Sequence, residues 1–250
     1  MRKFGLIGYP LGHSFSKKFF TEKFAREHIE DCSYELYPIA DINQLQSLIN
    51  EEINLAGLNV TIPYKSAVIS FLDSLSDEAR EINAVNVIKI RREGEDMFLS
   101  GFNSDISGFR ESLLPLLGCR RGNAIVLGTG GSSKAVCRVL EKIGMNVINV
   151  SRNPGTRLIT YKDLDREIIR GSALIINTTP LGMLPDIDSK PPVDYDSLTK
   201  DQILYDLVYN PERTAFLIEG EKRGCTVING MEMLRIQAEK SWEIWNDESL

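Results

Sequence analysis

The hydrophobic pattern of the C-terminal half predicts alternating strands and helices. Residues 124–127 form a short apolar run, and a glycine-rich turn and apolar positions at helical spacing from Val136 to Ile143 follow. Gly144 stands where a left-handed residue would end that helix, and Asn146–Val150 is a second apolar strand. The other elements expected in this half are strands at Leu174–Asn177, Ile203–Val208 and Thr226–Ile228, and helices at Glu212–Arg223 and Gly230–Asn246.

The N-terminal half alternates in the same way and then changes to a hairpin. Its expected strands are Lys3–Gly8, Ser33–Tyr37, Leu55–Thr61, Ala84–Arg91 and Met97–Phe102. Its expected helices are Lys17–His28, Ile42–Ile49, one that begins at Tyr64, and the connecting helix Asp105–Gly118. Such a pattern favours a mixed sheet covered by helices. The sequence therefore predicts an α/β fold of two domains, an N-terminal mixed-sheet domain (1–103) and a Rossmann-like domain (104–230).

The turn after residues 124–127 has the chemistry of a dinucleotide site. Gly128 permits a tight turn, and Gly130 and Gly131 leave room for a pyrophosphate against the backbone N–H groups at a helix N-terminus. The third glycine of the G-x-G-x-x-G pattern falls on Ser133, so the motif is incomplete. Its position between a strand and a helix supports it, and the N-terminal domain, which has no phosphate loop, becomes the candidate substrate domain.

The residues after the second strand of this unit predict which cofactor binds. An acidic side chain there would bind the ribose 2′-hydroxyl of NAD, whereas an arginine suits the 2′-phosphate of NADP. The chain has Ser151 and Arg152 at this point, with Arg157 a little further on and no carboxylate between them. A solvated arginine after a strand is common, but the glycine turn upstream favours NADP.

Composition limits the remaining choices. The chain has 250 residues and a formal net charge of −6, with no basic stripe that would indicate nucleic acid or an anionic membrane. The four cysteines lack paired spacing, and with only two histidines we expect no metal site. No apolar run approaches a membrane span or a signal peptide. These features predict a cytoplasmic enzyme of a small-molecule substrate.

Hydride transfer to NADP requires a group that exchanges a proton with the substrate. Lys65 follows an apolar strand and a proline, where a side chain reaches the end of the sheet, and Asp105 begins a helix. A solvated lysine and a helix N-cap are the simpler interpretations of these two taken singly. His13 is a third candidate and ranks below Lys65, because the neighbouring serines of its loop, Ser14 and Ser16, favour ligand hydrogen bonds over an oriented imidazole.

Eight stretches, in order along the chain, together resemble the shikimate dehydrogenase family. They are GYPLGHSFS (Gly8–Ser16), NVTIPYK (Asn59–Lys65), INAVNV (Ile82–Val87), GFNSDISGF (Gly101–Phe109), GTGGSSKA (Gly128–Ala135), NTTPLGM (Asn177–Met183), YDLVYNP (Tyr205–Pro211) and NGMEMLRIQA (Asn229–Ala238). The resemblance implies NADP-dependent interconversion of 3-dehydroshikimate and shikimate in chorismate and aromatic amino-acid biosynthesis. It also implies that the C-terminal helix 231–250 packs back on the N-terminal domain.

The same resemblance implies roles for individual residues. Lys65 and Asp105 match the catalytic pair. The expected substrate-binding residues are Ser14, Ser16, Thr61, Asn86, Tyr209 and Gln237. The expected cofactor-binding residues are Gly128, Thr129, Gly130, Gly131, Ser132, Ser133, Ser151, Arg152, Thr178, Met183, Leu207 and Gly230.

Departures from the family pattern lie on the cofactor side. Lys134 replaces a frequent arginine, and Glu232 replaces a glycine near the expected nicotinamide position.

One alternative is a quinate/shikimate dehydrogenase that uses NAD, which would be expected to carry an acidic residue near Arg152. A methyltransferase would also require a carboxylate there. A third alternative is a non-catalytic, NADP-sensing regulatory protein, which the presence of both Lys65 and Asp105 argues against. The expected state is a monomer or a homodimer.

Overall fold

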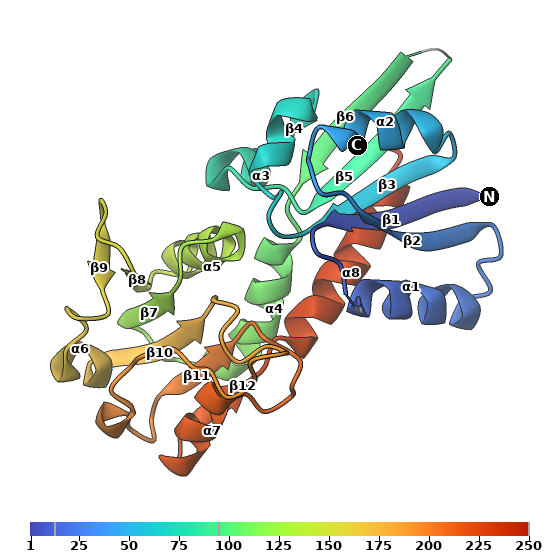
Figure 1. The fold of residues 1–250 in the computed structure, drawn as a ribbon. Helices are drawn as coiled ribbons and strands as arrows, with labels where there is room; N and C mark the ends of the chain where they lie inside the picture. The colour runs from blue at the N-terminus through green and yellow to red at the C-terminus, as the bar shows by residue number, and fades with distance from the viewer. Residues whose placement is uncertain (13, 95, 250) are drawn as a thin grey trace. The chain divides into compact units, whose positions relative to one another are not determined.

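The computed structural model describes residues 1–12, 14–94 and 96–249 (Figure 1). They divide into two compact units, unit 1 (Met1–Ser104 with Gln237–Leu250) and unit 2 (Asp105–Ile236). Each unit is built around one six-stranded sheet with helices packed on it. The prediction of an α/β fold is confirmed.

Unit 1 contains a mixed sheet. Its order is β2-β1-β3-β5-β6-β4, in which β1 runs parallel to β2 and β3, whereas β5 runs antiparallel to β3 and β6. The short strand β4 runs parallel to β6. The strands are β1 (Arg2–Gly8), β2 (Cys32–Pro38), β3 (Leu55–Val60), β4 (Ser74–Leu75), β5 (Val87–Glu93) and β6 (Asp96–Phe102). The helices are α1 (Phe15–Arg26), α2 (Gln44–Glu51), the 3-10 helix η1 (Ala67–Phe71), α3 (Asp77–Ile82) and the C-terminal part of α8 (Met231–Asn246).

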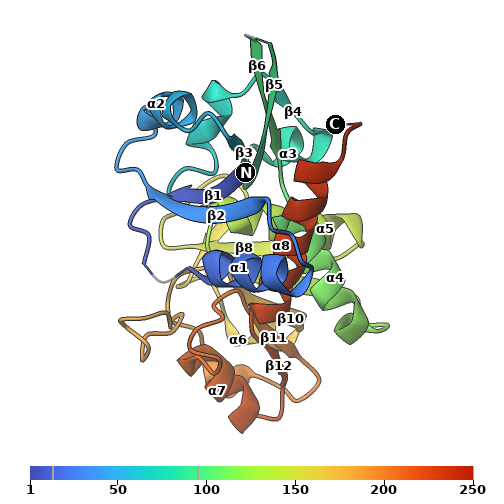
Figure 2. The same ribbon diagram turned by 90° about the vertical axis from the view of Figure 1, so that its right-hand side faces the viewer.

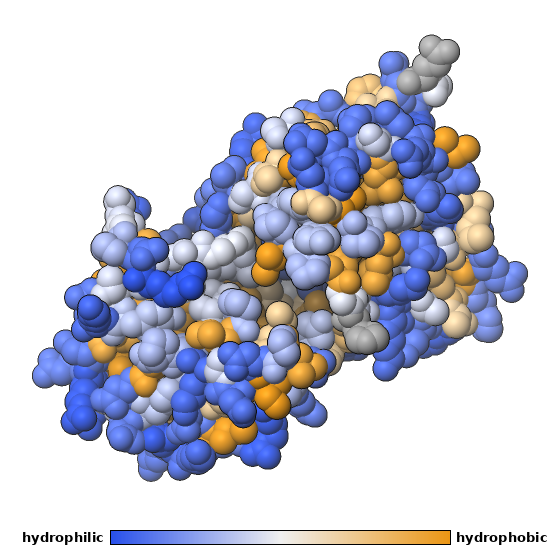
Figure 3. All heavy atoms as spheres, in the orientation of Figure 1, coloured by the Kyte–Doolittle hydropathy of each residue, from blue (hydrophilic) through white to orange (hydrophobic). Residues whose placement is uncertain are grey.

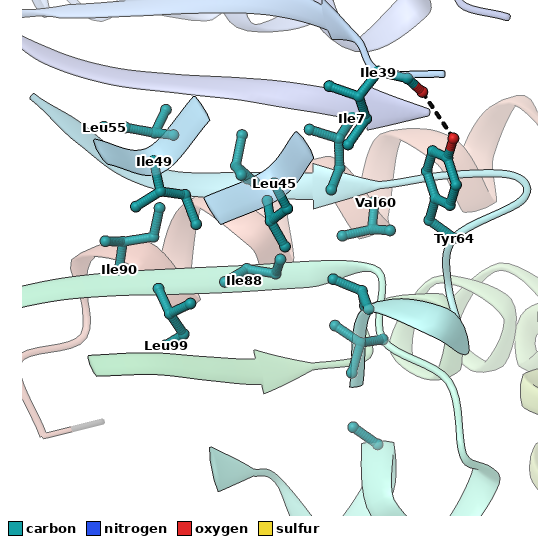
Figure 4. Packing of buried hydrophobic residues seen from close by; sticks show 14 residues of the cluster. Ile7, Ile39, Leu45, Ile49, Leu55, Val60, Tyr64, Ile88, Ile90 and Leu99 are labelled. Atoms are coloured by element: carbon teal, nitrogen blue, oxygen red, sulfur yellow. Dashed lines mark hydrogen bonds between the residues drawn. The ribbon is translucent and has the colours of Figure 1, made fainter. Parts of the chain in front are cut away.

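The helix expected to begin at Tyr64 is wrong in its start and its type. The backbone turns at residues 62–66, and only the short 3-10 helix η1 follows, from Ala67 to Phe71. The Tyr64 ring is buried in the core, and its hydroxyl donates a hydrogen bond to the Ile39 carbonyl at 2.8 Å (Figure 4). This buried contact favours a turn that directs Tyr64 inward.

The two faces of the unit 1 sheet carry separate hydrophobic cores, because side chains alternate along each strand. On one face Ile7 packs with Leu45 and Ile49 of α2 (Figure 4). On the other face Phe4 packs with α1 and with Trp245 of α8, whose ring stacks on Phe4 at a centroid distance of 4.7 Å. The indole N–H of Trp245 donates to the Ile88 carbonyl at 3.0 Å, which ties the end of α8 to the sheet.

Unit 2 contains a fully parallel sheet of order β12-β11-β10-β7-β8-β9. Numbered within the unit and read from the β9 edge, this order is 3-2-1-4-5-6, that of a dinucleotide-binding domain. The strands are β7 (Asn123–Leu127), β8 (Asn146–Ser151), β9 (Leu158–Thr160), β10 (Ser172–Asn177), β11 (Ile203–Asp206) and β12 (Thr226–Ile228). The helices are α4 (Asp105–Leu117), α5 (Gly131–Lys142), α6 (Arg166–Arg170), the 3-10 helix η2 (Tyr195–Ser197), α7 (Ala215–Lys222) and the first residues of α8.

Helices α4 and α5 of unit 2 lie side by side (Figures 1 and 2). Gly144, just after α5, has the expected left-handed backbone, with φ of +80°. Hydrophilic residues occupy most of the surface that faces the viewer in Figure 3. Within the described part of the chain, no helix combines the length and the apolar character that crossing a membrane requires.

Candidate functional site

The glycine turn of unit 2 requires glycine at its first position. Gly128 follows β7 with φ of +115°, a region that other residues rarely adopt. A Cβ on Gly128 would lie 2.6 Å from the hydroxyl oxygen of Thr178, which itself donates to the Leu127 carbonyl at 2.7 Å. The first residues after β7 and β10, which are neighbouring strands, are therefore packed together. In this strand order they lie at the switch point, where such sheets bind ligands.

The second glycine leaves backbone exposed at a helix N-terminus. Gly130 is the N-cap residue of α5, and a Cβ built on it has no atom within 4 Å among the described residues. Gly131 and Ser132 form the first turn of this 12-residue helix, and Thr129 is exposed beside it. The N–H groups and dipole at such a helix end favour a phosphate group. The turn thus fits the pyrophosphate of a dinucleotide.

Ser133 occupies the third glycine position and is buried. Its hydroxyl donates a hydrogen bond to the Gly128 carbonyl at 2.7 Å, so this buried polar group has its partner within the turn. This hydrogen bond explains how a residue with a side chain fits where the strict motif has glycine.

The end of β8 presents a positive charge. Arg152 is exposed directly after the strand, and the hydroxyl of Ser151 accepts a hydrogen bond from the Asn153 N–H at 3.2 Å. Burial raises the pKa of Tyr161, and the charge of Arg152 nearby partly offsets that rise. Residues 150–157 therefore present a guanidinium and contain no carboxylate. This combination suits a 2′-phosphate.

The loops after β10 and β11 are held by a buried carboxylate that the sequence did not single out. Asp206 has no exposed surface, and it accepts hydrogen bonds from the Asn177 amide at 2.9 Å, the Val208 N–H at 3.0 Å and the Thr214 hydroxyl at 2.5 Å. Burial is the main influence on this group and raises the pKa of Asp206 to about 6. The only sequence signal was its place in the stretch Tyr205–Pro211.

The loops after β10, β11 and β12 carry three further predicted cofactor residues. Leu207 donates its N–H to the Asn177 carbonyl at 2.9 Å, and a Cβ on Gly230 would overlap the Leu207 carbonyl oxygen. Gly230 in turn donates its N–H to the Val208 carbonyl at 3.2 Å. Met183 lies in the loop after β10 with 46% of its surface exposed. Backbone packing at Gly230 therefore fixes the start of α8 against the end of β11.

Unit 1 brings two predicted substrate residues into direct contact. The side-chain amide of Asn86 is buried and donates to Gln237 Oε1 at 3.2 Å and to Ser104 Oγ at 3.1 Å. The Asn86 carbonyl oxygen Oδ1 accepts from the Ser104 N–H at 2.7 Å. An amide pair of this kind can exchange one of its hydrogen bonds for a ligand hydroxyl.

The other predicted residues of unit 1 lie shortly after β3 or at the start of α1. Thr61 comes directly after β3 and donates its N–H to the Ile7 carbonyl at 3.0 Å. Lys65 is half-buried in the next turn, where its carbonyl accepts from the Val85 N–H at 2.7 Å. Ser14 is the N-cap residue of α1, but among the described residues its hydroxyl makes no capping hydrogen bond. Ser16 lies in the first turn of α1, and His13 lies outside the described residues.

Two predicted residues belong to unit 2. Asp105 is the first residue of α4 and is 2% exposed, and Tyr209 is half-buried in the loop after β11. Residues 1–12, 14–94 and 96–249 contain no group of three or more His, Cys, Asp or Glu side chains that could hold a metal ion.

The family model of the shikimate dehydrogenase substrate binding domain matches residues 6–88. The shikimate dehydrogenase (NADP(+)) of Methanococcus aeolicus is 36% identical over 260 residues, which cover 96% of this chain and 90% of that protein. The chain belongs to the shikimate dehydrogenase family. The resemblance seen in the eight sequence stretches is confirmed.

Solved structures of shikimate dehydrogenases have the same fold over nearly the whole chain. Shikimate dehydrogenase 1 of Peptoclostridium difficile is 36% identical, with a TM-score of 0.87, and the match covers 99% of this chain and 92% of that one. The enzyme of Thermus thermophilus, solved in complex with NADP(H) and shikimate, is 32% identical with a TM-score of 0.83, and the match covers 98% and 94%.

Proposed function

We propose that this chain is an NADP-dependent oxidoreductase that interconverts 3-dehydroshikimate and shikimate, a step of chorismate and aromatic amino-acid biosynthesis. The observation that carries the proposal is the similarity to shikimate dehydrogenases over 96% or more of the chain. The parallel sheet of unit 2, with its exposed helix N-terminus at Gly130 and its arginine after β8, supports a dinucleotide cofactor.

We assign substrate recognition to unit 1 and to Tyr209 of unit 2. Ser14 and Ser16 would donate hydrogen bonds to the substrate carboxylate from the start of α1. Thr61, Asn86 and Gln237 would bind the ring hydroxyls. The contact between the amides of Asn86 and Gln237 supports this assignment, because both groups already converge on one point. Tyr209 would lie beside the carboxylate.

We assign the proton transfer to Lys65 and Asp105. Oxidation of shikimate breaks a carbinol C–H bond and the adjacent O–H bond, so a hydride and a proton both leave the substrate. NADP supplies the hydride acceptor when it is bound. Lys65 and Asp105 would orient the hydroxyl, and its proton would pass to the Asp105 carboxylate or to Lys65 in its uncharged amine form; in the reverse direction the same group would return it. Asp105 is 2% exposed, which limits the access of water to this carboxylate.

We assign cofactor binding to unit 2. The turn from Gly128 through Thr129, Gly130, Gly131, Ser132 and Ser133 would hold the pyrophosphate, with Ser133 supporting the turn through its bond to the Gly128 carbonyl. Ser151 and Arg152 would bind the 2′-phosphate ribose. Thr178, Met183, Leu207 and Gly230 would border the nicotinamide half. Unit 1 is accordingly the substrate domain and unit 2 the cofactor domain.

We also propose that the protein acts in the cytoplasm, where NADP is reduced and reoxidised, as a monomer or a homodimer. The oligomeric state is measured directly by light scattering on a size-exclusion column.

Initial rates with two substrates and two cofactors test the proposed function. Purified protein is given shikimate or quinate, each with NADP or NAD. The proposal requires that shikimate with NADP has the highest kcat/KM. Faster reaction of quinate with NAD would instead indicate the quinate dehydrogenase alternative. A protein that binds NADP without turning over any of the four pairings would be a regulatory protein, and the proposal would be wrong.

A further inference from the structure

A chain of hydrogen-bonded polar side chains, most of them buried, connects to the predicted substrate residues Asn86 and Gln237 of unit 1. Its members are Tyr34 of β2, Asn59 of β3 and Ser241 of α8. Tyr34 is 3% exposed, and Ser241 has no exposed surface. None of the three belongs to the set of substrate residues assigned above.

Tyr34 connects α1 to the sheet. Its hydroxyl donates to Asn59 Oδ1 at 2.8 Å, and its ring stacks on Phe20 at a centroid distance of 4.5 Å. The Ser16 side chain acts on the same phenol group and lowers the pKa of Tyr34, but by less than burial raises it. Burial raises the pKa of Tyr34, which keeps the hydroxyl protonated and able to donate.

Asn59 and Ser241 continue the chain to the amide pair. The Asn59 amide donates to Ser241 Oγ at 2.9 Å and to the Asn86 carbonyl at 3.3 Å. Ser241 Oγ in turn donates to the backbone carbonyl of Gln237, one helical turn earlier, at 2.8 Å. The Asn86 backbone is therefore held by Asn59 and the Gln237 backbone by Ser241, and the side chains of Asn59 and Ser241 are hydrogen-bonded to each other.

Ser104 closes this network. Its hydroxyl lies 3.4 Å from Ser241 Oγ and accepts from the Asn86 amide at 3.1 Å. Each polar group of such a buried network depends on its neighbours, because an unpaired buried donor or acceptor is strongly unfavourable. Removing one hydroxyl is therefore expected to disturb Asn86 and Gln237 together.

We propose that Tyr34, Asn59 and Ser241 are positioning residues, which fix the orientation of Asn86 and Gln237 for recognition of the substrate ring hydroxyls. This inference rests on the proposed function. It extends that function to residues that do not themselves touch substrate.

The chain offers a matched control on the same strand. Tyr37 of β2 also has a buried hydroxyl, but within the described ranges this hydroxyl has no hydrogen-bond partner. Tyr34→Phe and Tyr37→Phe thus remove the same atom from the same strand, with and without a network attached. Because one buried hydrogen bond contributes about 0.5–1.5 kcal/mol, KM for shikimate should rise about 3- to 10-fold in Tyr34→Phe. In Tyr37→Phe, KM for shikimate should stay within about twofold of the wild-type value. KM for NADP should do the same in both variants.

Ser241→Ala gives a second measurement if Tyr34→Phe does not fold. KM is measured for shikimate and for an analogue that lacks one ring hydroxyl. If Ser241 positions the amide pair, the discrimination between the two substrates should fall about 3- to 10-fold in Ser241→Ala. A purely structural role would raise both KM values in parallel and leave their ratio unchanged.

The outcomes separate this inference from the proposed function. Wild-type turnover of shikimate with an unchanged KM in Tyr34→Phe, or with an unchanged substrate ratio in Ser241→Ala, would overturn the inference alone. Absence of shikimate turnover by the wild-type protein would overturn the proposed function and the inference with it.

Discussion

An alanine at position 130 would place a methyl group at the exposed N-terminus of α5. Gly130 has φ of −74° and ψ of −177°, which alanine adopts readily, and its Cβ would meet no atom of the described residues within 4 Å. Alanine is a poorer N-cap residue than glycine by about 0.5–1 kcal/mol. For a chain of this length, such a loss lowers Tm by about 1–4 °C.

Cofactor binding should respond far more strongly than stability. The new methyl group would stand where a phosphate oxygen must approach the backbone N–H groups of α5. A hydrogen bond to a charged group contributes about 1.5–3 kcal/mol, so the Kd for NADP should rise about 10- to 100-fold in Gly130→Ala. KM for shikimate should change by less than about twofold, because Gly130 lies in unit 2 and was not assigned to the substrate.

Titration calorimetry with NADP and a thermal melt measure the two effects separately. Gly230→Ala provides the contrast, because its Cβ would overlap the Leu207 carbonyl oxygen. Overpacking of this kind typically destabilises a protein by about 1–3 kcal/mol. The melting temperature of Gly230→Ala should therefore fall more than that of Gly130→Ala. If Gly130→Ala binds NADP with a Kd within about twofold of the wild type, the glycine turn does not hold the phosphates.

Three further substitutions test individual side chains. Lys65→Ala should lower kcat about 10²- to 10⁴-fold, with KM for shikimate changed only a few-fold; steady-state kinetics with the opposite pattern would make Lys65 a binding residue only. Arg152→Ala should raise KM for NADP about 10- to 100-fold and leave KM for NAD unchanged, and an equal effect on both cofactors would exclude a 2′-phosphate contact. The pKa of Asp206 is raised from 3.8 to about 6, so the folded state binds this proton more tightly than the unfolded chain does. The resulting stabilisation, about 3 kcal/mol, is present below pH 4 and is lost as the pH rises through 6. The free energy of unfolding, measured in urea, should therefore fall with pH between 4 and 6 more steeply in the wild type than in Asp206→Asn.

The sequence predicted the elements that have strong apolar periodicity and missed several of the short ones. Strand β9 has three residues and helix α6 has five, too few for a periodic pattern to appear. The expected helix at Tyr64 failed for a different reason. A buried hydrogen bond from Tyr64 to Ile39, which lies 25 residues earlier, accompanies a turn that local propensity alone does not indicate.

Some features of the candidate site can likewise be predicted from the sequence, and others cannot. The glycine turn and Arg152 could be predicted because their chemistry is local to one strand–turn–helix unit. Asp206 could not, because a single aspartate at the end of a strand is also a common turn residue. The bond between Asn59 and Ser241 joins residues that are 182 positions apart, and only the folded sheet with α8 packed on it brings them together.

Transfer of deuterium from substrate to cofactor tests the central claim most directly. Shikimate that carries deuterium on the carbinol carbon to be oxidised is incubated with the wild-type protein and NADP, and the products are analysed by mass spectrometry and NMR. A hydride-transferring shikimate dehydrogenase should place one deuterium on the reduced nicotinamide for each 3-dehydroshikimate formed. Release of the deuterium to water, or no formation of 3-dehydroshikimate, would contradict the proposed reaction.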